Sequence, residues 1–330
     1  MNKIVIKVRP LLASTLAFLL CFSLTACSGQ RHTASWTDLF DTYSSLTIYD
    51  PMTSLRSDRL SDQLHDYLLT FHQETDIYHH YEGMVNLYDL NQAAGKEALS
   101  VSDQLFDFLC WCRTACQESQ GKVNVMLGPV TALWEQTRKD GKLPSDRALQ
   151  KAGTHVSIDL LVLDQKARTA YISDPEGRID VGALAKGYAG RLAGHWLSDQ
   201  DLDDYLIDLG GNIITKGKPK GSGHNSFVIG IRDPDRTDGS YSQTVTLSGS
   251  TSCAVTSGDY ERYIDINGRR YHHIIDPDTL YPSTWHHSVT ILCSDSAAAD
   301  MLSTALFCMN EKDGRKLAAS YQAEVIYQDQ

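Results

Sequence analysis

The spacing of apolar and polar residues along the chain predicts both helices and strands. Apolar residues at helical spacing predict helices at 60–79 and 102–120, and the apolar run AAADMLSTALFCM predicts a largely buried helix at 297–309. Shorter apolar or alternating runs predict strands in LFDTYSSLTIYD, HVSIDLLVLD, TAYIS, YLIDLGGNI, SFVIGIR, QTVTLSG, RYIDING and SVTILC. Because these strands follow one another as hairpin-like neighbours, the pattern predicts an α+β fold of mainly antiparallel sheets with flanking helices.

The N-terminus has the pattern of an export signal. Lys3, Lys7 and Arg9 precede an uncharged, mostly apolar run from Leu11 to Ala26. That run is short for a membrane-spanning helix and ends in small residues, which favours a cleaved signal over a retained anchor. The sequence therefore predicts a signal peptide at residues 1–26.

The four residues that end this segment, Leu24 to Cys27, resemble the lipoprotein box of bacteria. In such a box the cysteine is lipidated and becomes the first residue of the mature chain; the alternative is an ordinary signal with a chance cysteine. We expect a lipidated tether at 27–35 and one domain at 36–330. The predicted location is extracytoplasmic, with the domain anchored to the cell membrane through lipid on Cys27.

Charge and cysteine content narrow the function classes. The net charge is −11, and loss of the basic signal makes the mature chain more acidic, so nucleic acid is excluded as an expected partner. Six cysteines remain after Cys21 and Cys27; their even number permits disulfides in an exported protein without requiring them. Cys110, Cys112 and Cys116 share a helix-like stretch without zinc-site spacing, which favours buried thiols.

Three polar segments lie within otherwise apolar surroundings, and the first is RIDVGALAKGYAGR at 178–191. A strand that ends near Asp180 is expected to pass through Gly182 into a helix. The backbone amides at such a turn can hold an anion, and Lys186 lies in the first turns of the helix. A glycine-assisted turn with a solvated lysine is the alternative.

The second segment is the helix with Asp300 and Thr304. Residues four apart share a helix face, so their carboxylate and hydroxyl oxygens point the same way. Such hard oxygen donors suit magnesium and are poor ligands for zinc or copper. A structural cap or ion pair for Asp300 is the alternative.

The third segment, 256–282, contains a predicted hairpin with its turn at Asn267-Gly268, followed by His272 and His273. Adjacent residues of a strand face opposite ways, so at most one of the two histidines enters a site. A single imidazole can also be a purely structural hydrogen-bonding group.

Taken together, these segments resemble the ApbE family, the FAD:protein FMN transferases. The matching stretches are DVGALAKGY, YLIDLGGNI, the block from TSGDYERY to HHIIDP, and ADMLSTAL, in the order and spacing typical of the family. The resemblance spans nearly all of residues 36–327. It implies an ApbE-like, T-fold-like architecture, and a lipoprotein signal fits it as well.

The resemblance also implies roles for particular residues. His273 and Asp300 are implied to be catalytic, and lipid attachment falls on Cys27. Magnesium is implied to take a backbone carbonyl from Ala183 and side-chain oxygens from Asp300 and Thr304. The residues implied to bind FAD are Phe40, Tyr78, Val123, Asn124, Asp180, Lys186 and Ile274.

Two positions depart from the family pattern. The chain reads Gly-Lys-Val-Asn at 121–124 where a Gly-Ala-Phe-Asp stretch is usual, so Asn124 replaces a carboxylate. Leu280 replaces the glycine that usually follows DPxT, which changes the chemistry of a turn.

The implied reaction is the transfer of FMN from FAD, with magnesium, to a threonine or serine hydroxyl of an exported flavoprotein, with release of AMP. Two other functions stay open: an FAD pyrophosphatase that forms FMN and AMP, and a flavin-binding lipoprotein without turnover.

Overall fold

The computed structural model describes residues 31–236, 238–249 and 252–329. The predicted signal peptide and Cys27 lie outside these residues. The first strand begins at His32, so the last four residues of the predicted tether lie in the fold itself.

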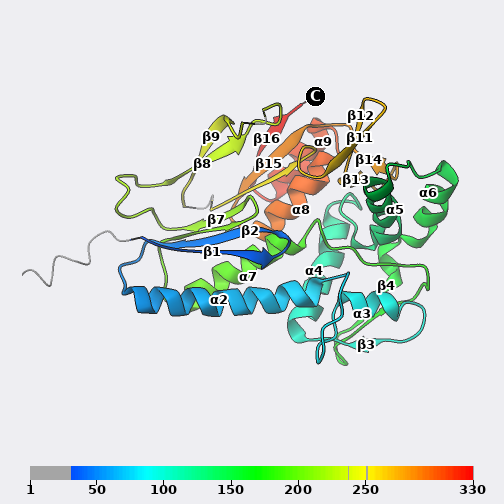
Figure 1. The fold of residues 1–330 in the computed structure, drawn as a ribbon, viewed down its shortest axis with the longest axis horizontal. Helices are drawn as coiled ribbons and strands as arrows, with labels where there is room; N and C mark the ends of the chain where they lie inside the picture. The colour runs from blue at the N-terminus through cyan, green and yellow to red at the C-terminus, as the bar shows by residue number, and fades with distance from the viewer. Residues whose placement is uncertain (1–30, 237, 250–251, 330) are drawn as a thin grey trace, which may run out of the picture.

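An antiparallel sheet of seven strands forms the centre of the molecule (Figure 1). In spatial order its strands are β1 (His32–Leu39), β2 (Thr42–Ile48), β6 (Tyr205–Leu209), β7 (Asn212–Lys216), β10 (Cys253–Gly258), β15 (Ser288–Cys293) and β16 (Glu324–Gln328). Each neighbouring pair is antiparallel, which agrees with the α+β prediction.

Helices pack on one face of this sheet. They are α2 (Ser54–Thr75), α7 (Ala185–Asp199), α8 (Ser296–Phe307) and α9 (Glu311–Ser320). Helix α2 buries Leu60, Leu64, Leu68 and Phe71, the helical spacing that the sequence predicts for a core-facing stripe. Helix α8 is buried almost all round and packs against α7, β10 and β15. The site-bearing segments of α7 and α8 therefore meet in the interior.

The opposite face of the sheet carries a separate hairpin of β8 (Phe227–Arg232) and β9 (Tyr241–Leu247). Phe227 and Leu247 pack with Ala254 and Leu292 of the large sheet in a second, smaller apolar cluster. The central sheet is thus covered on both faces.

The remaining elements gather beside one end of α8 and α2 (Figure 1). They comprise helices α3 (Leu87–Gln92), α4 (Asp103–Glu118), α5 (Gly128–Asp140) and α6 (Asp146–Ala152), the 3₁₀ turns η1 (Val125–Leu127), η2 (Gly153–His155) and η3 (Ile158–Leu160), and strands β3 (Leu99–Ser100), β4 (Leu161–Asp164), β5 (Thr169–Ile172), β11 (Tyr263–Ile266), β12 (Arg269–His272), β13 (Ile275–Asp276) and β14 (Tyr281–Pro282). The β11–β12 hairpin turns at Asn267 and Gly268, both with positive φ, as the sequence predicts.

Several predicted boundaries are wrong. The stretch 39–50 is not one strand, because Phe40 and Asp41 form the turn between β1 and β2, with φ of 52° and 53°. YLIDLGGNI is likewise two strands, β6 and β7, joined at Gly210-Gly211 with φ of 61° and 90°. Only 161–164 of HVSIDLLVLD is strand, and it follows a 3₁₀ turn.

Two further corrections concern segments next to the candidate site. Helix α2 ends at Thr75 rather than at His79, because the side chain of Asp76 redirects the chain into a loop. Residues before Asp180 form no strand; Asp180 is held instead by a backbone hydrogen bond from its N–H to the carbonyl of Val125.

Leu280, the residue that replaces a usual glycine, has a φ of 62°. This left-handed conformation costs a non-glycine residue about 1 kcal/mol or more. Trp134 offsets the cost, because its indole N–H donates to the carbonyl of Leu280 at 2.9 Å and its ring lies in the apolar cluster against which Leu280 packs.

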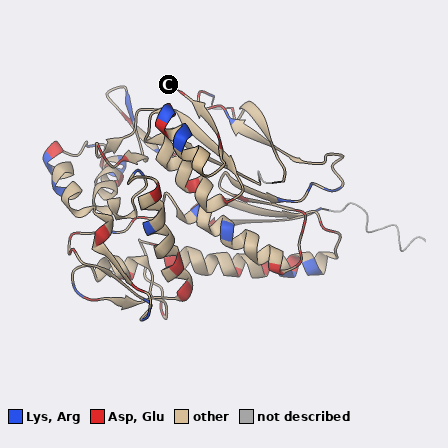
Figure 2. Cartoon of the chain, turned by 180° about the vertical axis from the view of Figure 1, so that it is seen from behind, with Lys and Arg blue, Asp and Glu red and all other residues tan. Residues whose placement is uncertain are grey.

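Charged positions of both signs are interspersed along the helices in the view from behind (Figure 2). Within the described residues, no helix is both long and apolar enough to cross a membrane. The six cysteines in this part of the chain are free, and Cys112 and Cys116 are buried while Cys110 is half-buried.

Candidate active site

The site centres on the contact between the N-terminus of α7 and the middle of α8. The backbone N–H of Gly187 donates to the Asp300 carboxylate at 2.7 Å. A Cβ on Gly187 would lie 2.2 Å from the Cβ of Asp300 and 2.6 Å from the carbonyl oxygen of Ser296. Only glycine therefore permits this close approach of the two helices, which brings Asp300 to the first turn of α7.

This hydrogen bond frees a carbonyl. In a regular helix the N–H of Gly187 would donate to the carbonyl of Ala183, four residues earlier. It donates to Asp300 instead, and within the described residues the Ala183 carbonyl receives no backbone hydrogen bond. The Gly187 amide therefore bonds the Asp300 carboxylate and leaves the Ala183 carbonyl oxygen available to another partner.

Asp300 is a buried carboxylate, and few interactions offset the cost of burying its charge. Burial raises its pKa, whereas the charge of Lys186 and the Gly187 hydrogen bond act in the opposite direction. No salt bridge joins Asp300 to a basic side chain in the described part of the protein. Asp300 does cap α7, the structural alternative, but a carboxylate has further lone pairs for a cation.

Asp208 is a site residue that the sequence reasoning missed. It lies at the end of β6, accepts the N–H of Gly211 at 2.7 Å, and has its pKa raised by burial, an effect that the Lys186 charge opposes. The side-chain amide of Asn212 lies close to Asp300. Its nitrogen makes no well-formed hydrogen bond to any residue that the structure describes. The sequence did contain a signal for Asp208: the Gly210-Gly211 pair in YLIDLGGNI predicts a turn, and Asp208 and Asn212 lie on either side of it.

Three hydroxyl groups adjoin the carboxylate along α8. Ser257 of β10 lies 2.8 Å from Ser303 and 3.4 Å from Thr304, measured between hydroxyl oxygens. Ser303 donates to the backbone carbonyl of Asp300 at 3.0 Å, while Thr304 is half-buried one residue farther on. Hydroxyl and carboxylate oxygens thus line one side of α8.

These oxygen donors could supply part of a magnesium coordination shell. Among the described residues, no three His, Cys, Asp or Glu side chains converge as a preformed metal cluster. Mg²⁺ is commonly held by one or two carboxylates together with phosphate oxygens of the substrate, rather than by an all-protein cage. Asp300, Thr304 and the Ala183 carbonyl supply such a partial set.

His273 follows β12 and takes one defined tautomer. Its Nδ1 lies 3.3 Å from the carbonyl oxygen of Arg262, so Nδ1 carries the hydrogen and Nε2 is left with a lone pair. Burial lowers the pKa of His273 to about 3, assisted by His272 and by the charges of Arg262 and Arg138. The imidazole is therefore neutral near pH 7, and its Nε2 lone pair can accept a hydrogen bond.

His272 has the structural role that one of the two histidines was expected to have. It is buried, its Nε2 donates to the carbonyl of Ser283 at 2.7 Å, and its Nδ1 accepts the N–H of Ile274 at 3.2 Å. Ile274, a predicted flavin neighbour, is itself buried. The burial of His272 is consistent with the prediction that at most one of the two histidines enters a site.

Asp180 connects the α7 turn to a group of charged and aromatic side chains. Its two carboxylate oxygens accept from Gly182 N–H at 3.0 Å and from the Thr131 hydroxyl at 2.7 Å. Burial and the charge of Asp180 raise the pKa of Tyr78 to about 12, whereas the charge of Arg262 lowers it. Tyr78, Asp180 and the His273 segment therefore face a common region.

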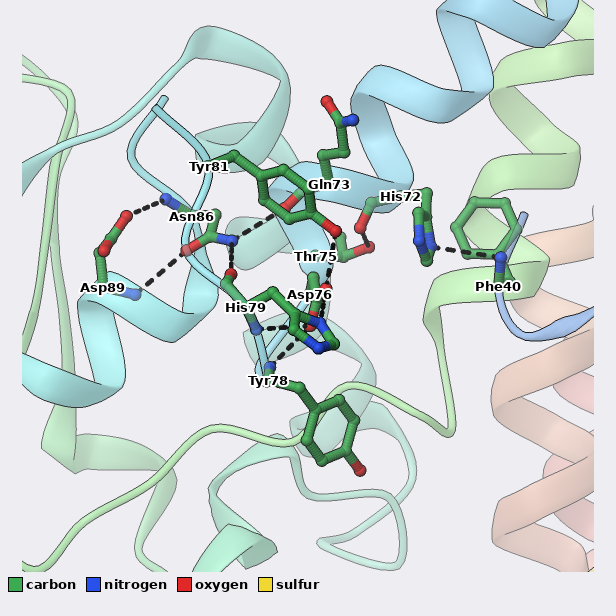
Figure 3. A network of polar contacts seen from close by, with 10 residues as sticks. All are labelled: Phe40, His72, Gln73, Thr75, Asp76, Tyr78, His79, Tyr81, Asn86 and Asp89. Carbon is green, nitrogen blue, oxygen red and sulfur yellow. Dashed lines mark hydrogen bonds and ion pairs between the residues drawn. The ribbon is translucent and has the colours of Figure 1, made fainter. Parts of the chain in front are cut away.

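The loop that presents Tyr78 is held by the Asp76 carboxylate and by Asn86, whose amide donates to the carbonyl of His79 at 2.8 Å (Figure 3). Asp76 accepts the backbone N–H of Tyr78 at 2.6 Å, the Nδ1 of His79 at 2.9 Å and the Tyr81 hydroxyl at 2.9 Å. Burial raises the pKa of Asp76, but these hydrogen bonds outweigh it and the net pKa is lowered. The Tyr78 ring remains 52% exposed, as a ligand-facing aromatic side chain would be.

Phe40 lies in the β1–β2 turn beside the same loop (Figure 3). Its N–H donates to Nδ1 of His72 at 3.2 Å, and its ring meets the His72 ring edge-on with centroids 5.4 Å apart. A phenylalanine at positive φ is strained, and such strain commonly marks a functional position.

The side chains of Val123 and Asn124 make their contacts inside the protein. Val123 is buried in the core, and the Asn124 amide accepts the N–H of Met126 at 2.9 Å and donates to the carbonyl of Val156 at 2.7 Å. An aspartate could not make the second bond. Lys122 beside them pairs with Asp276 at 2.9 Å and Asp278 at 2.8 Å, which ties this segment to the one that follows His273.

We therefore expect Asn124→Asp to destabilise the fold, because a carboxylate oxygen would face the carbonyl oxygen of Val156. The expected loss in the free energy of unfolding is about 1–3 kcal/mol, the usual cost of an unsatisfied buried pair. Thermal unfolding of the variant and the parent measures it. A variant of unchanged stability that binds FAD more tightly would contradict the internal role of Asn124.

The structure brings Asp300 and the Lys186 charge together where α7 meets α8; Ala183 lies just before α7, and Thr304 lies one turn farther along α8, beside Ser257. Arg262 acts on both Tyr78 and His273, and Asp180 acts on Tyr78. Within the described residues Lys186 forms no salt bridge, and its charge acts on the carboxylates of Asp208 and Asp300. Backbone amides, a basic side chain and oxygen donors are the groups that could hold a phosphate-bearing ligand together with a hard cation.

Comparison with known proteins identifies the family of this chain. The sequence model of the ApbE family matches residues 40–327, and the chain belongs to that family. It is 30% identical to an FAD:protein FMN transferase of Klebsiella pneumoniae over 239 residues, 72% of each protein. It is 33% identical to one of Treponema pallidum over 232 residues, 67% of this chain and 64% of the relative.

Solved structures share the fold. The ApbE protein of Thermotoga maritima matches with a TM-score of 0.78 at 24% identity, over 90% of this chain and 94% of that one. The flavin transferase ApbE of Vibrio cholerae matches with a TM-score of 0.75 at 24% identity, over 91% of this chain and 93% of that one. The ApbE-like fold expected from the sequence is confirmed.

Proposed function

We propose that this protein is an FAD:protein FMN transferase that uses Mg²⁺ and modifies a threonine or serine of an exported flavoprotein. The acceptor hydroxyl oxygen attacks the phosphorus of the FMN half of FAD. The bond from that phosphorus to the bridging oxygen breaks, the hydroxyl proton is removed, and AMP leaves. Names of the relatives support the transferase activity, and the site geometry supports the finer assignments.

One observation carries the proposal: the Asp300–Gly187 hydrogen bond, which places a carboxylate and the freed Ala183 carbonyl at the first turn of α7. Asp300, Thr304 and that carbonyl would hold Mg²⁺, which supplies charge neutralisation at the pyrophosphate when bound. Lys186 adds a positive charge beside the same phosphates.

His273 is the residue proposed to remove the proton from the acceptor hydroxyl. With Nδ1–H directed at the Arg262 carbonyl, Nε2 is the nitrogen that can take the hydrogen of the acceptor hydroxyl. Tyr78 and Phe40 would flank the flavin end, and Asp180 the turn beside the phosphates. These residue roles are proposals that rest on position and contact geometry.

Incubation of the protein with FAD, MgCl₂ and a candidate exported flavoprotein tests the function. Mass spectrometry should show one FMN added to a threonine- or serine-containing acceptor peptide, together with free AMP. Formation of FMN and AMP with an unmodified acceptor would instead identify a pyrophosphatase. Retention of intact FAD would identify a flavin-binding protein without turnover.

We also propose that the protein is exported and lipid-anchored at Cys27, a position outside the described residues. Cys27→Ser should give a chain without lipid that is released or remains unprocessed, because no thiol is available for acylation. Metabolic labelling with a fatty acid checks this. Normal labelling of the variant would refute the anchor without affecting the proposed transferase activity.

A further inference from the structure

Two cysteines lie directly opposite each other in the central sheet. Cys253 begins β10, Cys293 ends β15, and the antiparallel register pairs their Cα atoms. Directly opposed residues of an antiparallel pair have Cα atoms about 4.5–5.5 Å apart. A disulfide spans Cα distances of about 4.4–6.8 Å, so the strand register places the two Cα atoms within the range that a disulfide requires.

Both thiols are on the same face of the sheet. Cys253 and Cys293 belong to the main core cluster beneath the helices, whereas their neighbours Ala254 and Leu292 belong to the cluster under the β8–β9 hairpin. This alternation is what a strand requires, and it directs the two sulfur atoms to one side. The membership of the two apolar clusters thus matches the side-chain direction that the register requires.

One cysteine of the pair borders a cavity. Both residues are buried, but Cys253 lines a cavity of 860 Å³ whose described walls include His195 and Asp295. The Cys293 thiol donates to the backbone carbonyl of Asp295 at 3.2 Å. Asp295 is the N-cap of α8, the helix that carries Asp300.

We propose that Cys253 and Cys293 are a disulfide-forming pair that fastens β10 to the strand leading into α8. In the step, both thiols lose their hydrogens and the two sulfur atoms bond. A disulfide oxidant, such as oxidised glutathione, accepts the two electrons and two protons and leaves as two thiols. This disulfide is inferred from the strand register and does not depend on the proposed transferase function.

Burial sets the conditions under which the bond forms. It raises the pKa of Cys253 to about 12 and that of Cys293 to about 11, so little of the reactive thiolate exists at neutral pH. Exchange in the folded protein is therefore slow. Refolding in a glutathione redox buffer removes this barrier, because the thiols are exposed before the sheet closes.

The test uses the full chain, both native and refolded from urea, in oxidised and reduced glutathione at pH 8.5. After denaturing alkylation and digestion, mass spectrometry should identify one major cross-linked peptide that joins Cys253 to Cys293. The linked protein should melt about 5 °C or more above the same sample treated with dithiothreitol, by the usual stabilisation from closing a loop of this length.

Matched variants make the result specific. Cys253→Ser and Cys293→Ser should each lose the cross-link and the thiol-dependent shift, whereas Cys116→Ser, which removes a buried cysteine on α4, should keep both. Recovery of both thiols as alkylated peptides after refolding would overturn the proposal. Predominant mixed disulfides with glutathione, or links to other cysteines, would overturn it as well.

Discussion

Asp300→Asn is expected to lower FMN transfer by several orders of magnitude without destabilising the metal-free protein. The amide keeps an oxygen that can accept the Gly187 N–H, so the α7–α8 contact survives. What is lost is the negative charge that would balance a divalent cation at the pyrophosphate. Transfer rates measured across a magnesium titration check the first part of the prediction.

The stability half of this prediction follows from the sign of the pKa shift. Burial raises the pKa of Asp300, so the ionised carboxylate favours the unfolded chain at any pH above its ordinary pKa. Replacing it by a neutral amide should leave the melting temperature of the metal-free protein unchanged or higher. Thr304→Val is the milder comparison, since it removes only a neutral ligand.

A different outcome would point to a structural Asp300. If Asp300→Asn melts well below the parent while its remaining activity keeps the parental magnesium midpoint, Asp300 serves only as the cap of α7. Differential scanning fluorimetry with and without MgCl₂ and FAD separates the two cases.

His273→Gln is expected to lower kcat by about 100- to 10,000-fold, the usual contribution of a positioned general base. Glutamine can still donate to the Arg262 carbonyl, so the local backbone is preserved. FAD affinity should change little, because the side chain loses a proton acceptor and not a phosphate contact. Single-turnover transfer and FAD binding, measured on the same sample, check the split.

The pH profile gives a second measure of the same group. The pKa of His273 in the ligand-free protein lies near 3, so its protonation should not reduce kcat/KM between about pH 5 and pH 8. The depressed pKa also means that its contribution to stability is present above the ordinary histidine pKa and is lost as pH falls. His272→Gln is the matched control, and it should lower the melting temperature instead. A parental kcat in His273→Gln would exclude the base assignment.

The sequence predicted best those parts of the fold that depend on local pattern. The stripe of α2, the buried α8 and the Asn267-Gly268 turn each follow from spacing or from turn chemistry within a few residues. The turns at Phe40-Asp41 and Gly210-Gly211 lie inside runs of mostly apolar residues. The pattern alone therefore predicts one continuous strand at each place.

Local spacing predicts that some residues of the candidate site share a face, but not which distant residues they contact. Asp300 and Thr304 share a face by helical geometry alone, which the sequence gives directly. The Gly187 hydrogen bond joins residues 113 positions apart and depends on the approach of two helices. Asp208 and Lys122 were missed for the same reason, since their partners come from distant segments.

The amide of Gly187 has a thermodynamic consequence. It connects Asp300, a proposed cation ligand, to the turn of α7 that would receive the phosphates, so occupancy of one subsite changes the field at the other. Binding free energies coupled in this way are reciprocal. Whatever factor Mg²⁺ adds to the affinity for FAD, FAD must add to the affinity for Mg²⁺.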